Sequence, residues 1–526
     1  MANLEADHVV GSHVALGLVE RLAGAVATDP GVARLVDSRT IYVVPRLNPD
    51  GVDRLLAGKP RADLRANLAA IDRDRDGKPN EDGPDDIDGD GLATIMRVKD
   101  AKATLVPDAK DARLLRKADP AKGERAVYSE MTEGIDNDGD GLINEDPPGG
   151  VDLNRNWPHN WTEYNPETGV APASEPEVNA LIRFAFAHPE IAAIWSFGLN
   201  DNLRAEAKGV AAADAPYFAE LTKGFARATG PAGSDAPKDQ PKDEPVKAAD
   251  PPKDEPKADA PPPDRARVAQ PKGQRGAMKG QAKGQGGGPG GPAAPPGAAP
   301  ASVAASGIEG TTDGALSEWA YHQFGAVGLA SRLWPAPEPA AGGPPLAGDG
   351  EARWLDWNDK AAGGAAFVPF HAVDHPTLGK VEVGGWKPGV RLNPPAESIA
   401  AIADGHYAFL KDLAGRLPTL AIKEAKAEAR GGGVFEIKAT VENAGYLPTA
   451  LAQGLTTRRA APVLVKLDLG DAKLLAGKAL DRVESLPGSG GSREFRWLVL
   501  APATKPLAIE ASCPRAGTAR REIPLR

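Results

Sequence analysis

The sequence holds one cysteine, Cys513, among 526 residues. A single thiol excludes an internal disulfide framework and a cysteine-rich zinc site, so histidines and carboxylates are the only plausible metal ligands. No apolar run approaches the roughly 18 residues that a membrane-spanning helix needs. The first residues lack the basic and apolar regions of a signal peptide. We therefore expect no membrane span, and this sequence contains no recognisable export signal.

Basic residues are fewer than acidic residues. The chain has 62 lysines and arginines against 72 aspartates and glutamates, which gives a formal net charge of −10. Such a balance argues against a general nucleic-acid binder, so we expect no nucleic-acid partner. The length exceeds what one hydrophobic core can fill, which predicts at least two folded domains.

Aromatic residues are absent from residues 231–303, where Pro, Ala, Gly, Lys and Asp dominate. A segment of this composition cannot bury enough apolar surface to form a core, so we predict a disordered insertion. Its second half is basic, which leaves contact with an anionic surface or RNA as the alternative. The lack of aromatic side chains weakens that alternative, because bases would have nothing on which to stack.

The rest of the chain divides by its hydrophobic patterns. Apolar residues at helical spacing and β-branched runs alternate before and after the insertion, which predicts one α/β domain over residues 1–417. From Pro418 onward, short alternating strands separated by glycine-rich turns predict a small β-sandwich over residues 418–526. The expected helices cover 9–25 and 177–187, the same α/β style resumes over 319–333 and 399–413, and the expected strands cover 40–45, 434–441, 462–469, 495–500 and 507–511.

Three acidic stretches within residues 71–150 space aspartates two apart and then place a glycine. Alternate carboxylates followed by a turn glycine form the front half of a calcium-binding loop. The closing glutamate of an EF-hand is absent, because Pro147 stands in its place in the third stretch, and Asn144 and Asp146 could complete the shell instead. We expect bound calcium with a structural role; the alternative is a solvated acidic loop. The aspartates are Asp72, Asp74 and Asp76, then Asp86, Asp88 and Asp90, then Asp136, Asp138 and Asp140.

Four ordered motifs carry a family resemblance: Asn3–Val10, Ile41–Gly51 (IYVVPRLNPDG), Gly150–Trp157 (GVDLNRNW) and Ser317–Leu333 (SEWAYHQFGAVGLASRL). In combination they resemble the zinc carboxypeptidases of the carboxypeptidase A-like family. The resemblance implies a mixed, twisted sheet flanked by helices, and the acidic loops and closing β-sandwich look like those of a bacterial subgroup. Family members carry leading strands before the first motif, so we expect those strands to be missing here. The resemblance and the calcium loops also imply a secreted or periplasmic protein.

The family needs a His-x-x-Glu pair and a later histidine to hold zinc, and a glutamate as general base. In this sequence Glu5 and His8 fill the first motif with the two ligand types exchanged. Gly198 stands at the third-ligand position, and Arg332 stands at the general-base position, eleven residues after Tyr321. Two protein ligands hold zinc poorly, and a guanidinium cannot accept a proton. Zinc is therefore doubtful, and no intact catalytic set remains.

Other positions of the family motif are kept. Asp152 matches the aspartate that orients the first histidine ligand, and beside Glu5 it would face a second carboxylate. We hypothesise that Arg332 supplies the lost positive charge by pairing with one or both carboxylates. Asn154 and Arg155 match the residues that grip the C-terminal carboxylate of a peptide, although they could persist only for loop hydrogen bonds.

Arg97 could replace the arginine that polarises the scissile carbonyl in the family. The remaining histidines have no ligand spacing among themselves and are predicted to be surface or packing residues. They are His13, His159, His188, His322, His371, His375 and His406.

Three functions fit these observations. The first is a pseudopeptidase that binds a peptide or protein C-terminus without hydrolysing it. The second is an active carboxypeptidase with a rebuilt zinc site made of Glu5, His8 and one of Asn200, Asp201 or Glu382. The third is a calcium-stabilised extracellular structural or adhesion module.

Overall fold

The computed structural model describes residues 1–73, 75–147, 149–204, 209–230, 312–339, 343, 345–348, 350–502 and 505–525. These residues belong to one compact unit. The insertion predicted at residues 231–303 and the predicted calcium ligand Asp74 lie outside the described residues.

Helices form where apolar residues recur at helical spacing and a polar side chain caps the first turn. Asn48 caps α3, because its side-chain oxygen accepts the Gly51 N–H at 3.0 Å, and Pro49 follows at the first helical position. The helices are α1 Val10–Ala25, α2 Pro30–Ser38, α3 Pro49–Ala57, α4 Pro176–Ala187, α5 Ala215–Thr229, α6 Leu316–His322, α7 Gly350–Lys360, α8 Ala396–Arg416 and α9 Ala452–Thr456, with 3₁₀ turns η1 Pro120–Lys122 and η2 Pro166–Thr168.

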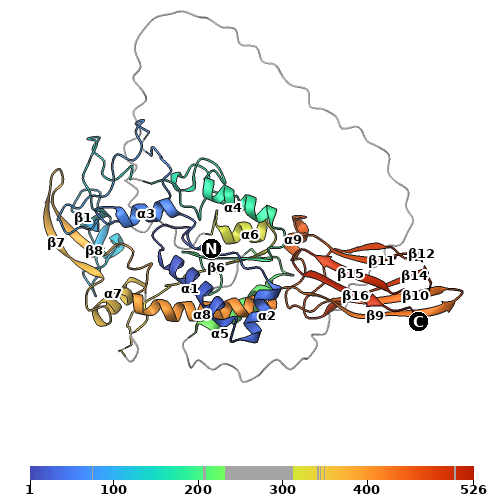
Figure 1. The fold of residues 1–526 in the computed structure, drawn as a ribbon. Helices are drawn as coiled ribbons and strands as arrows, with labels where there is room; N and C mark the ends of the chain where they lie inside the picture. Colours follow the sequence, from blue (N-terminus) through green and yellow to red (C-terminus); the bar gives the residue numbers. More distant parts are fainter. Residues whose placement is uncertain are drawn as a thin grey trace, which may run out of the picture. The chain divides into compact units, whose positions relative to one another are not determined.

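The centre of the α/β part is a parallel pair of strands, β5 (Ala193–Phe197) and β6 (Val327–Ser331), in register from Ala193–Val327 to Phe197–Ser331. In Figure 1, β6 lies between α4 and α6 on one side and α1 and α8 on the other. Successive side chains of β5 point to opposite faces, so Ile194 packs with the α4 and α6 cluster and Phe197 with the α1 and α8 cluster.

The strand predicted at residues 40–45 is wrong. This segment runs beside the start of the chain, where the Ala2 N–H donates to the Val44 carbonyl at 2.9 Å and the Leu47 N–H donates to the Ala2 carbonyl at 3.0 Å. Met1 in turn bonds to β5, because the Phe197 N–H donates to its carbonyl. These two bonds to Ala2 are too few for a regular ladder, so the β-branched run is not a strand.

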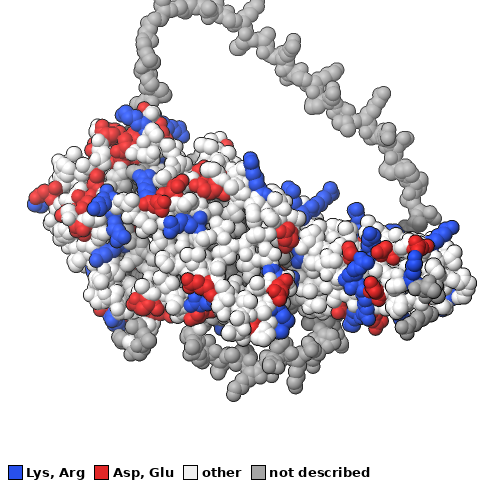
Figure 2. Space-filling view, in the orientation of Figure 1, with Lys and Arg blue, Asp and Glu red and all other residues white. Residues whose placement is uncertain are grey.

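The acidic insertion forms an antiparallel sheet with a hairpin that comes much later in the chain. The strand order is β4 (Ser129–Thr132), β1 (Ile95–Val98), β8 (Gly379–Trp386) and β7 (Phe367–His375), and β2 (Leu105–Pro107) pairs with β3 (Leu115–Lys117) beside it. Met96, Val381 and Val383 form the core of this sheet. Figure 2 shows acidic side chains gathered at this end of the molecule.

The C-terminal part is a sandwich of two four-stranded antiparallel sheets, in the orders β12-β14-β10-β9 and β13-β11-β15-β16. Alternate residues of β10 are buried, as expected of a strand with one face on a core. The predicted fold class, a mixed α/β domain followed by an all-β domain, is confirmed. The strands are β9 Leu420–Gly431, β10 Val434–Asn443, β11 Val463–Asp468, β12 Lys473–Ala476, β13 Leu480–Val483, β14 Gly491–Leu500, β15 Leu507–Cys513 and β16 Gly517–Ile523.

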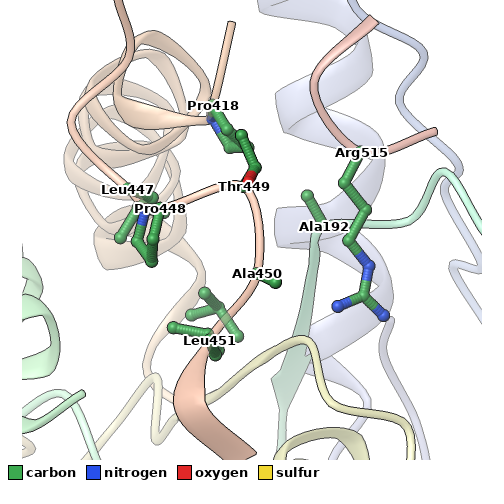
Figure 3. A pocket seen from close by; sticks show the side chains of 9 residues that line it. Ala192, Pro418, Leu447, Pro448, Thr449, Ala450, Leu451 and Arg515 are labelled. Carbon is green, nitrogen blue, oxygen red and sulfur yellow. The ribbon is translucent and has the colours of Figure 1, made fainter. Parts of the chain in front are cut away.

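The sandwich packs against the end of the central strands. Arg515 is buried, and its guanidinium donates to the carbonyl oxygens of Phe324 and Gly325 just before β6. Figure 3 shows its side chain beside a small cavity that is also lined by Ala192, Leu447 and Leu451. A buried guanidinium that binds two backbone carbonyls ties the two parts together.

Among the described residues, no single helix is long and apolar enough to cross a membrane. Helices α1 and α2 meet the length and composition criteria only when taken together, and they are bent by 114°.

His406 on α8 predicts how the fold responds to acid. Its ring stacks on Trp195 at 5.6 Å, its Nδ1 lies 2.7 Å from the Ile402 carbonyl, and its Nε2 is buried without a partner. Burial lowers the pKa of His406 to about 4. Because the folded pKa lies below the unfolded value, His406 contributes stability above pH ~6.5 that is lost as the pH falls toward 4.

The free energy of unfolding of the unmodified chain should fall between pH 7.5 and pH 4.5. We predict that this fall is smaller in His406→Phe, by on the order of 2–3 kcal/mol. Urea unfolding at the two pH values measures this loss. The exposed His13, changed to Phe, is the matched control and should leave the loss as it is in the unmodified chain. Equal acid sensitivity in the unmodified chain and the His406 variant would contradict the prediction.

Candidate active site

The turn before α1 buries three ionisable side chains. Glu5, Asp7 and His8 are each 1% exposed, and the neighbouring Leu4 lies in the core. Asn3 shapes the turn, because it adopts a positive φ of 53° and its Nδ2 donates to the His8 carbonyl at 2.8 Å. The His8 N–H donates to the Glu5 carbonyl at 3.2 Å. The exchanged metal motif is therefore a closed, buried turn.

Gly198 directly follows β5 and lies against Glu5. A Cβ atom at position 198 would be 2.6 Å from Glu5 Oε2, which is closer than real Cβ contacts allow. The Gly198 N–H donates to the Ser331 carbonyl at 3.3 Å, which places it beside Arg332 at the end of β6. The parallel strand pair thus brings Gly198 and Arg332 to the buried turn. Any side chain at 198 would displace the Glu5 carboxylate.

Asn154 binds Glu5 directly. Its Nδ2 donates to Glu5 Oε1 at 2.9 Å, and its Oδ1 accepts the Leu316 N–H at 3.1 Å. Asp152 stands beside this pair and accepts the Asn154 N–H at 2.8 Å. The amide of Asn154 is therefore engaged at both ends within the protein, which is the loop hydrogen-bonding role that the sequence left open for it.

Crowding and burial shift the carboxyl groups strongly. Burial, reinforced by the charge of Asp152, raises the pKa of Glu5 to about 7. Burial also raises the pKa of Asp7 to about 7, and it raises the pKa of Asp152. Glu5 Oε2 and both carboxylate oxygens of Asp7 are buried without a hydrogen-bond partner. Burial and repulsion between carboxylates thus disfavour their charged forms, which only a nearby positive charge can stabilise.

Arg65 supplies that positive charge. Its Nε lies 3.7 Å from Asp7 Oδ2. Burial alone would lower the pKa of Arg65, but Asp7, Asp152 and Glu5 outweigh it and hold the pKa above its usual range. The sequence hypothesis assigned this role to Arg332 and missed Arg65. Arg65 lies outside every family motif in the sequence. In the folded chain the Ala6 N–H donates to the Arg65 carbonyl, which brings the segment around Arg65 beside the buried turn.

Arg332 acts instead on His8. Burial, followed by the charges of Arg332 and Arg65, lowers the pKa of His8 to about 3. His8 is therefore neutral across the physiological range, and both of its ring nitrogens are buried without a hydrogen-bond partner. The pairing of Arg332 with Glu5 or Asp152 stays a prediction.

Arg97 lies in a different part of the fold from the buried turn. It is on β1 in the sheet of the insertion, where its guanidinium donates to the carbonyls of Ala112 and Arg113 and lies 3.5 Å from the centre of the Phe370 ring. These bonds hold the insertion together. Arg155 is 9% exposed and lies close enough to Asp152 to lower the pKa of that carboxyl group.

The residues proposed for a rebuilt zinc site have other partners. Asp201 accepts the Arg332 N–H and pairs with Arg204 at 2.7 Å, while Glu382 on β8 accepts the Tyr128 hydroxyl. Within the described ranges, the groups of three or more His, Cys, Asp or Glu side chains that could share an ion include neither Glu5 nor His8.

The acidic loops share one local geometry. In each loop the first aspartate (Asp72, Asp86 or Asp136) accepts the backbone N–H groups three and five residues later. The residue five positions later is a glycine with positive φ, which only glycine adopts easily. This is the conformation that aims alternate carboxylates at a common point.

The first and third loops meet, which the sequence did not predict. Asp138 belongs to three groups of carboxylates close enough to share an ion, and Asp86, Asp88 and Asp90 form a separate group. Glu145 closes one of the Asp138 groups, whereas Asp146 pairs with Arg73 and the Asn144 amide donates to the Thr132 carbonyl. The three groups are Asp76–Glu81–Asp138, Asp82–Asp136–Asp138 and Asp138–Asp140–Glu145.

Two parts of the chain match known protein families. Residues 1–83, which include Glu5, His8 and Arg65, match the zinc carboxypeptidase family. The chain carries a zinc carboxypeptidase domain at its N-terminus. Residues 419–524, which form the β-sandwich, match a family described only as a domain of unknown function.

Two curated relatives are similar to a short part of the zinc carboxypeptidase domain. Carboxypeptidase M of Mus musculus is 36% identical over 53 residues, which are 10% of this chain and 12% of the relative. Carboxypeptidase D of Anas platyrhynchos is 38% identical over 58 residues, which are 11% of this chain and 4% of the relative. The similarity therefore spans a small fraction of these relatives.

The charge balance of the zinc carboxypeptidase domain can be tested through Arg65. We predict that Arg65→Met lowers the free energy of unfolding at pH 8 by about 3 kcal/mol, because it leaves buried carboxylates without a cation. In a Glu5→Gln, Asp7→Asn background, Arg65→Met should lower the free energy of unfolding by less than half that amount, because two of the buried carboxylates are gone. Urea unfolding of the four variants of this cycle measures the coupling.

The matched control is Arg46→Met, since Arg46 pairs with Asp53 at 3.4 Å on the surface. Exposed pairs contribute about 0–1 kcal/mol, so this change should have little effect in either background. Additive effects of Arg65→Met and the two carboxyl changes would show that Arg65 does not compensate these charges.

Proposed function

We propose that this chain is a pseudopeptidase: a zinc carboxypeptidase domain that keeps a site for a peptide C-terminal carboxylate but no longer hydrolyses peptides. The observation that carries the proposal is the contact between Glu5 and Gly198. The third-ligand position has no side chain, and the space that a ligand there would need is filled by the Glu5 carboxylate.

The electrostatics support the same proposal. The buried turn holds two guanidinium groups, Arg65 and Arg332, close enough to influence His8. Two fixed cations disfavour a dication at the same place, and neither can act as a general base. Asp7 and Asp152, which act on Arg65, already provide the counter-charges that these cations require. The site is electrically completed by protein groups.

Arginine also supports binding of a carboxylate ligand. The Arg65 side chain is 31% exposed, and its Nε lies 3.7 Å from Asp7 Oδ2. Arg155 and Arg65 both lower the pKa of Asp152, so both guanidinium groups lie near this carboxyl group. A guanidinium suits a terminal carboxylate because it can donate two parallel hydrogen bonds.

Binding and hydrolysis can be measured separately with a pair of peptides that differ only in a free or an amidated C-terminus. We predict that calorimetry shows at least ten-fold tighter binding of the free acid. Mass spectrometry should find no released C-terminal residue, even with zinc supplied. Arg155→Met should abolish the preference for the free acid, whereas Arg183→Met on the exposed face of α4 should not.

The other functions have distinct outcomes in this experiment. Release of C-terminal residues together with stoichiometric zinc would show an active carboxypeptidase. Equal affinity for acid and amide would remove the peptide C-terminus as ligand and favour the structural or adhesion module.

We also propose that the acidic loops bind calcium and that the ions hold the insertion together. Without an ion, Glu81 and Glu145 keep buried carboxylate oxygens without partners. Burial, with contact from Asp82, raises the pKa of Glu145 to about 8. A hard dication among these oxygens would relieve both conditions. The calcium loops and the family resemblance together favour a secreted or periplasmic location.

Calcium binding predicts a stability that depends on the free ion. A site at 100 times its dissociation constant stabilises the fold by about 2.7 kcal/mol. We predict that calcium raises the melting temperature of chelator-treated protein, and that Asp138→Asn reduces this gain because Asp138 serves three carboxylate groups. Asp119→Asn, in an ordinary cap outside these groups, is the control. An unchanged melting temperature would count against calcium.

A further inference from the structure

A second group of potential metal ligands lies outside the buried turn and outside the acidic loops. His159 follows the Asp-Leu-Asn-Arg motif, and Glu318 and His322 are one turn apart on α6. One ligand atom from each residue lies within 4.8 Å of the other two. Glu318 Oε2 and His322 Nε2 are 3.4 Å apart.

The backbone around these residues is held in place by bonds that do not use the ligand atoms. The Gly314 N–H donates to the His159 carbonyl at 2.9 Å, and the Gln453 side chain donates to the His322 carbonyl at 2.9 Å. Glu318 and His322 keep side-chain exposures of 18% and 16%. The backbone at His159 and His322 is thus fixed, and the side chains of Glu318 and His322 remain reachable from solvent.

We propose that His159, Glu318 and His322 bind a divalent transition-metal ion of the zinc type. Two imidazoles and one carboxylate form a donor set that zinc uses in catalytic sites, where a fourth position stays open. Zinc–nitrogen bonds of about 2.0–2.1 Å place tetrahedral ligand atoms roughly 3.3 Å apart, close to the present spacing of Glu318 and His322. The proposal goes beyond the pseudopeptidase assignment and does not depend on it.

His159 is the ligand that has to move. Its ring stacks on that of His322 with centroids 4.0 Å apart and planes 8° from parallel. A metal ion lies in the plane of each imidazole that binds it, so two parallel rings cannot share an ion until one of them tilts. Tilting needs only side-chain rotation, because the carbonyl of His159 is fixed by Gly314.

The protonation state of His159 favours binding. Burial, helped by the neighbouring His322, lowers the pKa of His159 despite the carboxylates of Glu318 and Asp313. The carboxylate of Glu318 would supply negative charge to the ion.

A small hollow adjoins the group. Glu318 and His322 line it together with Asn202, Ser317 and Gly328. Val210, Phe218 and Tyr321 complete its lining, so the hollow has both polar and apolar walls. From the sequence, His159 and His322 are expected to be surface or packing residues, because no ligand spacing links them. Only the fold brings His159 against Glu318 and His322, which are four residues apart on α6.

The experiment is a cobalt titration of tag-free, chelator-treated chain, with millimolar calcium present to occupy the acidic loops. Four-coordinate cobalt gives an intense visible absorption band that hexa-aqua cobalt lacks. We expect one equivalent of cobalt to produce this band and zinc to displace it. His159→Phe, which keeps an aromatic ring against His322, and Glu318→Gln should each weaken binding on the order of 100-fold.

Two further variants separate this site from the buried turn. His8→Phe and Glu5→Gln should leave the cobalt band unchanged, and circular dichroism checks that every variant is folded. Loss of the band in the His8 variant with retention in the His159 variant would overturn the proposal. A chain without any four-coordinate band would overturn it as well, and would identify the stacked histidines as a packing pair. The cobalt titration measures metal binding only. Its result therefore neither supports nor contradicts the proposed binding of a peptide C-terminus.

Discussion

The zinc carboxypeptidase domain depends on one electrostatic arrangement, in which Glu5, Asp7 and Asp152 are buried around Arg65. A single guanidinium cannot balance three carboxylates in a poorly solvated site, which is why the pKa values of Glu5 and Asp7 rise to about 7. Bound protons on these two carboxyl groups and the Arg65 guanidinium both reduce the negative charge of the site.

This arrangement explains the other substitutions in the buried turn. Gly198 leaves room for the Glu5 carboxylate, and Asn154 donates to it, so the three residues fit one another. His8 stays neutral between two guanidinium groups. A histidine at position 198 would collide with Glu5, so restoring one family residue at a time should not restore a zinc site.

Local pattern predicted most elements of the fold. The helices at Val10–Ala25 and Pro176–Ala187 and four strands of the sandwich follow from periodicity, because each buries one face. The strand expected at residues 40–45 does not form, because its two hydrogen bonds to Ala2 are too few for a regular ladder. Pairing of the acidic insertion with the β7–β8 hairpin joins strands about 285 positions apart, from Arg97 to Glu382, and no local pattern encodes that.

The site was predictable in its positions but not in its charges. Family motifs singled out Glu5, His8, Gly198 and Arg332, and in the structure Gly198 lies against Glu5 and Arg332 lies near His8. Arg65 and Asp7 were missed, because their importance comes from burial and from a contact between separate segments. Glu145 was missed for the same reason, as the first and third acidic loops meet only in the folded chain.

The most direct test of the central claim is a crystal structure of the zinc-soaked chain with anomalous scattering recorded at the zinc edge. We predict no anomalous peak between Glu5 and His8, and an Arg65 guanidinium within ion-pair distance of Asp7. An anomalous peak coordinated by Glu5 and His8 would contradict the account, because it would show that the exchanged ligands still hold the metal.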